Sequence, residues 1–307
     1  MTPTMPTMSP SDLRSRLTGV VGFPVTPFTD ALAVDLEGLR ANVADMTAHP
    51  FCVIVAAGGT GELYSLNTDE HTAVVKTSVQ ATAGRMPVIA GVGGNLGVAI
   101  EQATKAWKAG ADGILALPPY YPHADEAGLL AYYAAIGAAT PLGLLVYSRD
   151  WVNPGPAFVQ KLADLPTAIA WKDGQGDPRR YQIIMNAVGD RLHWVGGAGD
   201  DLVGTYYRLG IRCYTSSISN VSPKLALQLH DVAAKGDEVT LADLMKKYVV
   251  PLYAFRAKRK GFEVSVMKAM MQIQGHAAGP VRPPLANLNA GELDELQALM
   301  EDWKPVL

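Results

Sequence analysis

Cysteine and histidine are scarce in the 307-residue sequence, which has only two cysteines and six histidines. Cys52 and Cys213 are far apart, and each lies inside an apolar run, a pattern typical of buried thiols in a reducing cytoplasm. None of the histidines has a cysteine or histidine partner at the spacing of metal ligands. The sequence therefore predicts no metal site and a cytoplasmic location.

Net charge and long apolar runs are also lacking. The formal charge is −3 and 18% of the residues are charged, which gives no indication of a nucleic-acid or membrane partner. No stretch approaches the roughly 18 uninterrupted apolar residues of a membrane span, and the N-terminus lacks a signal-peptide pattern. Residues 1–10 are expected to form a disordered leader. The one dense basic stretch, Arg256–Lys260, is interpreted as a solvated helix face.

What the sequence does contain is a repeated alternation of short apolar runs and amphipathic segments, the pattern of βαβ units. Asp35, Asn67 and Asp125 precede three of the amphipathic segments, at positions where helix N-caps belong. Eight runs are predicted to be strands: Gly19–Val25, Cys52–Ala56, Pro87–Gly91, Gly113–Leu117, Gly143–Tyr147, Ile169–Lys172, Leu192–Gly196 and Arg212–Thr215.

Eight such repeats favour a closed parallel barrel over an open doubly wound sheet. A doubly wound fold usually has G-x-G-x-x-G after its first strand, whereas here the first strand runs into Phe23–Phe28. We therefore expect an α/β fold, a (β/α)8 TIM barrel over residues 11–222, and a C-terminal helical region over residues 223–307. That region has four helical patterns: Pro223–Lys235, Leu241–Lys260, Val264–Gly275 and Ala290–Trp303.

Active sites of such barrels lie at the carboxyl ends of the strands, and Lys172 ends the sixth predicted strand. Every other lysine lies in a helix-like or terminal segment where it is expected to reach water. Desolvation lowers the pKa of a lysine and frees its amine to attack a carbonyl, so Lys172 is a candidate Schiff-base nucleophile. The alternative is a structural lysine in a buried ion pair with Asp173 or Glu62.

Other polar residues follow neighbouring strands. Tyr147 could transfer protons, or it could simply pack at the rim of the barrel. Thr60 follows two glycines, which could bring backbone N–H groups to a carboxylate or could only serve a tight turn. Asp200-Asp201 could be a metal pair, but an N-cap followed by a first-turn acid is the preferred interpretation.

Three further motifs stand out: Ala56–Glu62, Lys172–Asp177 and Gly275–Leu285, the last preceded by Val264–Lys268. They resemble the dihydrodipicolinate synthase/N-acetylneuraminate lyase superfamily, and the resemblance covers nearly the whole chain. Within that superfamily the sequence is most similar to the 5-dehydro-4-deoxyglucarate dehydratase branch. Val152 stands where the synthase branch has an arginine, which argues against dihydrodipicolinate synthesis.

The resemblance implies a role for each matching residue. Lys172 would form the imine, Tyr147 would relay protons, and Thr60 would hydrogen-bond Tyr147. Thr60 and the backbone of Gly59 would hold the carboxylate of the keto acid, and Gly61 is also expected to bind substrate. No cofactor beyond the covalent imine is implied, and the protein is expected to be a homo-oligomer, a dimer of dimers. Tyr121 matches the tyrosine that, in the synthase branch, reaches into the neighbouring subunit's site, and Gly199, Thr215 and Ser217 match positions that line the pocket. From charge and position rather than from the resemblance, Arg149 or Ser217 is the candidate for the distal carboxylate.

The expected activity is dehydration and decarboxylation of 5-dehydro-4-deoxy-D-glucarate to 2,5-dioxopentanoate. Two alternatives stay open at this point. One is a class I aldolase that cleaves a 2-keto-3-deoxy sugar acid to pyruvate and an aldehyde. The other is a non-catalytic homologue that only binds a sugar acid, although the presence of Lys172, Tyr147 and Thr60 argues against it.

Overall fold

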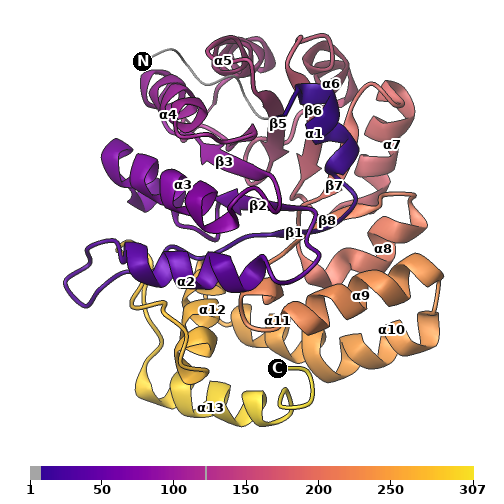
Figure 1. Ribbon diagram of the computed structural model, residues 1–307. Helices are drawn as coiled ribbons and strands as arrows, with labels where there is room; N and C mark the ends of the chain where they lie inside the picture. The colour runs from indigo at the N-terminus through magenta and orange to yellow at the C-terminus, as the bar shows by residue number, and fades with distance from the viewer. Residues whose placement is uncertain (1–7, 122) are drawn as a thin grey trace.

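The computed structural model describes residues 8–121 and 123–307, and its centre is a closed barrel of eight parallel strands. The strands are bonded in chain order, with β1 closing the ring against β8 (Figure 1). They are β1 (Gly19–Gly22), β2 (Val53–Ala56), β3 (Val88–Val92), β4 (Gly113–Ala116), β5 (Gly143–Ser148), β6 (Ala168–Asp173), β7 (His193–Gly196) and β8 (Cys213–Ser216).

Helices surround the barrel because each βαβ crossover places one on the outside. Asp35, Asn67 and Asp125 cap three of them through their side chains, as predicted. The surrounding helices are α2 (Leu36–Met46), α3 (Thr68–Thr82), α4 (Leu96–Lys108), α5 (Glu126–Ala138), α6 (Pro156–Leu162), α7 (Pro178–Val188) and α8 (Val203–Arg208).

An additional helix, α1 (Pro10–Arg16), covers the amino-terminal end of the barrel. Its Leu13 is fully buried against the start of β4, where a methyl group on Gly113 would lie 2.4 Å from Leu13 Cδ2. Ser9 caps α1, so the predicted leader of residues 1–10 is wrong at its end, and its residues 1–7 lie outside the described residues. Because α1 covers the amino-terminal end of the barrel, the active site is expected at the carboxyl end.

The C-terminal helices gather beside α2, β1 and α8 (Figure 1). The predicted helix over Leu241–Lys260 is present as far as Arg256 and begins earlier, at Glu238. It contains a π-helical turn at Met245–Val249, because Pro251 has no N–H to donate to the preceding turn. The helices are α9 (Pro223–Lys235), α10 (Glu238–Leu244), α11 (Val250–Arg256), α12 (Phe262–Ile273) and α13 (Ala290–Glu301).

Both cysteines are free and buried, as expected, but they are not apart in space. The side chains of Cys52 and Cys213 hydrogen-bond to each other, and this contact together with burial raises the pKa of the Cys213 thiol. Cys213 begins β8, and Cys52 precedes β2 and donates its N–H to Val20 of β1. The pair therefore belongs to the interior packing of the barrel.

Candidate active site

Lys172 lies inside the barrel mouth, near the end of β6 and directly beside Tyr147 of β5. Its side chain is buried, and Nζ lies 3.2 Å from the centroid of the Tyr147 ring and 5.0 Å from that of Phe23. Burial lowers the pKa of Lys172 well below its ordinary value, and repulsion from Arg149 adds to this effect, while Asp173 opposes it. An amine in this position is neutral over a wider pH range than an exposed lysine.

The alternative of a buried ion pair at Lys172 is wrong. Among the described residues, no carboxylate lies within ion-pair distance of its ammonium group. Asp173 instead pairs with Arg180, with Oδ1 and Nη1 3.1 Å apart, and burial raises the pKa of this carboxyl group to about 6. Glu62 pairs with Lys268 at 2.6 Å. Both acids therefore have other cations as partners.

Tyr147 is held by two glycines as well as by Lys172. A methyl group on Gly174 would lie 2.6 Å from Cε2 of Tyr147, and one on Gly197 would lie 2.6 Å from Cγ of Lys172. The Tyr147 hydroxyl donates to the Gly197 carbonyl at 3.2 Å. The implied hydrogen bond with Thr60 is therefore wrong for the described residues, because the hydroxyl points toward β7 instead.

The turn after β2 presents backbone donors to the same mouth. The N–H groups of Gly59, Thr60 and Gly61 donate to no other group in the described part of the chain. A methyl group on Gly59 would lie 3.2 Å from Nη1 of Arg149, so the guanidinium lies against this turn. Arg149 is also paired with Asp150 at 2.8 Å. Such a turn can bind a carboxylate through its amides with a cation beside it.

The turn is tied to the C-terminal helices by a buried ion pair. Glu62 ends the turn with a positive φ of 54°, and its carboxylate contacts Nζ of Lys268 on α12 and the backbone N–H of Arg282. Burial lowers the pKa of Lys268 to about 8, against the opposing effect of Glu62. The expectation that every lysine other than Lys172 reaches water is wrong here, since the Lys268 side chain is only 2% exposed.

On the opposite side of the mouth, Ser217 follows β8 and Thr215 lies within it, buried. The Ser217 hydroxyl accepts a hydrogen bond from Nη2 of Arg256 at 2.9 Å. Gly199 follows β7 with φ of +148°, and a methyl group there would lie 2.3 Å from the Tyr253 hydroxyl. Helix α11 thus brings Tyr253 and Arg256 against the loops that follow β7 and β8.

Asp200 is neither a metal ligand nor an N-cap. Gly199 occupies the cap position, and the Asp200 carboxylate accepts hydrogen bonds from the backbone N–H groups of Ser217 at 3.3 Å and Ile218 at 3.5 Å. Its own N–H donates to the Tyr253 hydroxyl at 2.8 Å. A fully buried carboxylate needs such donors, and the loop after β8 supplies them. Asp200 therefore joins the two loops.

The interpretation of Arg256–Lys260 as a solvated face holds only in part. Lys258 and Arg259 form partly exposed ion pairs with Glu295 and Glu292, but Arg256 is only 4% exposed. Arg256 was not predicted from the sequence, because a dense basic run is interpreted as one solvated unit. The sequence did contain one indication: Arg256 lies three residues after Tyr253, and therefore on the same face of the helix.

Tyr121 lies on the surface of the chain rather than inside the barrel mouth. Its side chain is 72% exposed, and with Tyr120 it lines a surface hollow of about 380 Å³ between the loop after β4 and helices α4 and α5. Neither Lys172 nor Thr60 lines this hollow. The geometry therefore does not support a role for Tyr121 in the active site of its own chain.

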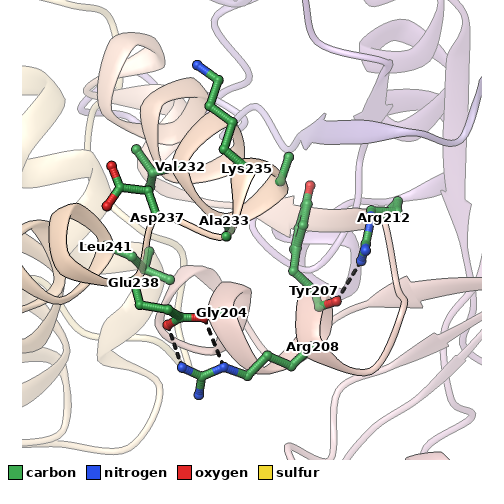
Figure 2. A pocket seen from close by; sticks show the side chains of 12 residues that line it. Gly204, Tyr207, Arg208, Arg212, Val232, Ala233, Lys235, Asp237, Glu238 and Leu241 are labelled. Carbon is green, nitrogen blue, oxygen red and sulfur yellow. Dashed lines mark hydrogen bonds and ion pairs between the residues drawn. The ribbon is translucent and has the colours of Figure 1, made fainter.

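A second hollow, of about 240 Å³, lies among α8, α9 and α10 (Figure 2). Arg208 and Glu238 form an ion pair across it, and Arg212 donates to the Tyr207 carbonyl at 2.6 Å. Its lining comes from the outer helices and the start of β8, and none of the candidate site residues belongs to it.

Within residues 8–121 and 123–307, no group of three or more histidine, cysteine, aspartate or glutamate side chains is arranged to hold a metal ion. In the same residues no helix has both the length and the apolar character that crossing a bilayer requires.

A closed (β/α)8 barrel with a desolvated lysine facing a tyrosine at its carboxyl end is the arrangement of the class I aldolase superfamily of enzymes. More narrowly, the chain belongs to the dihydrodipicolinate synthetase family, whose model matches residues 16–303.

Curated relatives align over almost their whole length. A probable 5-dehydro-4-deoxyglucarate dehydratase of Bradyrhizobium diazoefficiens is 38% identical over 301 residues, which is 97% of this chain and 96% of the relative. One of Rhodococcus opacus, with the same name, is also 38% identical over 301 residues and is 99% covered. The chain is therefore similar from end to end to proteins that carry this name.

Solved structures agree in fold. Dihydrodipicolinate synthase from Oceanobacillus iheyensis superposes with a TM-score of 0.91 at 28% identity, covering 97% of this chain and 100% of that one. YagE from E. coli, of the same family and solved in complex with pyruvate, superposes with a TM-score of 0.86 at 25% identity, covering 94% and 98%. The predicted fold class is thus confirmed.

Proposed function

We propose that the protein is a Schiff-base lyase that dehydrates and decarboxylates 5-dehydro-4-deoxy-D-glucarate to 2,5-dioxopentanoate, CO₂ and water. The observation that carries the proposal is the desolvated Lys172 amine in contact with Tyr147, opposite a turn with unbonded N–H groups. The names of the full-length relatives give the substrate.

The first half of the reaction builds the imine. The neutral amine of Lys172 attacks the ketone next to the substrate carboxylate, and water leaves as the carbinolamine collapses. The N–H groups of Gly59, Thr60 and Gly61 bind that carboxylate, with Arg149 beside them. Tyr147 donates and accepts the protons of these steps, since its ring contacts the amine and its hydroxyl lies at the mouth, on the Gly197 carbonyl.

The second half uses the imine as an electron sink. A proton leaves the adjacent CH₂ group, and the resulting enamine expels the β-hydroxyl group as water. The carbon–carbon bond to the distal carboxylate then breaks, its electrons flow into the conjugated iminium ion, and CO₂ leaves. The resulting dienamine is protonated at carbon and its enol becomes the aldehyde. Hydrolysis of the imine by water then releases 2,5-dioxopentanoate and returns Lys172 as a free amine. The covalent imine takes the place of a cofactor in every step.

An aldolase of the same family is the second candidate, because YagE, one of the solved neighbours, holds pyruvate. It would share the imine and break a carbon–carbon bond to release pyruvate and an aldehyde. Product analysis with 5-dehydro-4-deoxyglucarate separates the two. The proposal expects one CO₂ and one 2,5-dioxopentanoate for each substrate. Free pyruvate without CO₂ would favour the aldolase, and binding without any product would favour a non-catalytic homologue.

The proposal extends to assembly and location. We expect a cytoplasmic homo-oligomer, a dimer of dimers, in which the exposed Tyr120 and Tyr121 are covered by a neighbouring subunit. Substrate contact by Tyr121 would then occur in the neighbour's site. Light scattering of the purified protein tests the assembly, and a monomer at micromolar concentration would contradict it.

A further inference from the structure

Arg256 is a buried cation beside the candidate site for which the steps above give no role. It ends α11, outside the eight strands, yet its Nη2 donates to the Ser217 hydroxyl at 2.9 Å. Its guanidinium carbon lies 5.0 Å from the centroid of the Tyr253 ring, whose hydroxyl accepts from the N–H of Asp200. Two contacts thus fix α11 against the loops after β7 and β8.

Asp200 and Asp201 attract Arg256 electrostatically, but neither forms an ion pair with it. Among the described residues, no carboxylate lies within ion-pair distance of its guanidinium, and its buried Nε has no hydrogen-bond partner. Asp200, the nearby buried acid, directs its carboxylate to the N–H groups of Ser217 and Ile218. A buried donor without a partner is costly, so the unbonded Nε of Arg256 favours an acceptor that comes from outside the chain.

Arg149, unlike Arg256, is already paired with a carboxylate. It lies against Gly59, where the carboxylate beside the ketone is expected, and Asp150 already pairs with it. Around the barrel, β6 and β7 separate Arg149 after β5 from Ser217 after β8. A substrate joined to Lys172 and held at Gly59 has its far end free to reach the β8 side of the mouth.

We propose that Arg256, together with the Ser217 hydroxyl, binds the distal carboxylate of the substrate and makes the site selective for keto diacids over keto monoacids. This inference rests on the proposed function for the identity of the diacid. Bidentate binding through a planar guanidinium would fix the carboxylate until the C–C bond to it breaks.

The test uses two keto acids that form an imine but have no hydroxyl group to eliminate. 2-Oxoadipate ends in a carboxylate, whereas 2-oxohexanoate has a methyl group at that end. The measured quantity is the concentration of each that gives half-maximal labelling of the protein in the presence of cyanoborohydride. The wild type is expected to require less 2-oxoadipate than 2-oxohexanoate.

Arg256→Gln should raise the half-maximal concentration for 2-oxoadipate by about 10- to 100-fold, the range for a charge-assisted hydrogen bond, and leave that for 2-oxohexanoate unchanged. Arg259→Gln, three residues along the same run and paired with Glu292 at the surface, is the matched control and should change neither. If Arg256→Gln affects both compounds equally or neither of them, the inference is wrong.

Arg256→Lys provides a second variant in case the glutamine variant does not fold. It keeps the charge but loses the planar pair of donors, so part of the preference should remain. Equal changes for both compounds in this variant also overturn the inference. Because labelling needs no turnover, a wild-type protein that prefers 2-oxoadipate but releases no CO₂ would contradict the proposed function and leave the role of Arg256 intact.

Discussion

At the scale of single residues, the pKa of Lys172 depends on the charges of its neighbours, and the direction of this effect can be measured. Repulsion from Arg149 contributes to the low pKa of Lys172. Arg149→Ala removes that repulsion, so the pKa of Lys172 should rise and imine formation should need a higher pH. The pH at half-maximal rate of pyruvate labelling in the presence of cyanoborohydride measures this.

The control for this experiment is Arg208→Ala, which removes an exposed arginine paired with Glu238 on the outer helices. It should leave the pH profile of labelling unchanged. A midpoint that stays the same or moves to lower pH in Arg149→Ala would contradict the assigned role of its charge.

Tyr147 is expected to act on rate more than on binding. Tyr147→Phe keeps the ring under the Lys172 ammonium and removes only the hydroxyl that bonds Gly197. We expect kcat to fall by about 100- to 10,000-fold, the usual range for general acid–base catalysis, with labelling by pyruvate still detectable. A kcat within a few-fold of wild type would show that the proton relay lies elsewhere.

At the scale of elements, the Glu62–Lys268 pair connects the carboxylate-binding turn to α12. Both side chains are almost fully buried, so Lys268→Met alone leaves an unpaired Glu62 and should cost about 3–5 kcal/mol of unfolding free energy. The double variant Lys268→Met/Glu62→Gln should recover much of that loss. Urea denaturation measures both.

The matched control removes an exposed pair. Lys304→Met breaks the surface pair with Glu301 and should change the unfolding free energy little. If Lys268→Met lowers the unfolding free energy as little as this control does, the buried pair does not stabilise the turn. The contact between α12 and the site would then have no effect on stability.

The elements also show what sequence patterns can predict. The eight strands were predicted to within a few residues, because parallel strands buried on both faces give continuous apolar runs. The caps at Asp35, Asn67 and Asp125 followed from side-chain chemistry alone. The π-helical turn before Pro251 was missed because a local helical period does not report that a proline removes a hydrogen bond.

At the scale of the whole molecule, the site was predictable where it depends on strand order and unpredictable where distant segments meet. Lys172 and Tyr147 are neighbours because β5 and β6 pair in register. Arg256 and Lys268 reach the mouth from helices beyond the barrel, and nothing in their local sequence fixes which loop they contact. Tertiary packing, rather than composition, turned these two charged residues inward.

The central claim is that Lys172 forms the imine, and peptide mapping after reductive trapping tests it most directly. The protein is incubated with 5-dehydro-4-deoxyglucarate or pyruvate and cyanoborohydride, digested, and sequenced by tandem mass spectrometry. We predict a single adduct on Lys172 and none in Lys172→Ala. An adduct on Lys268, the other buried lysine with a lowered pKa, or no adduct with either keto acid, would contradict the account.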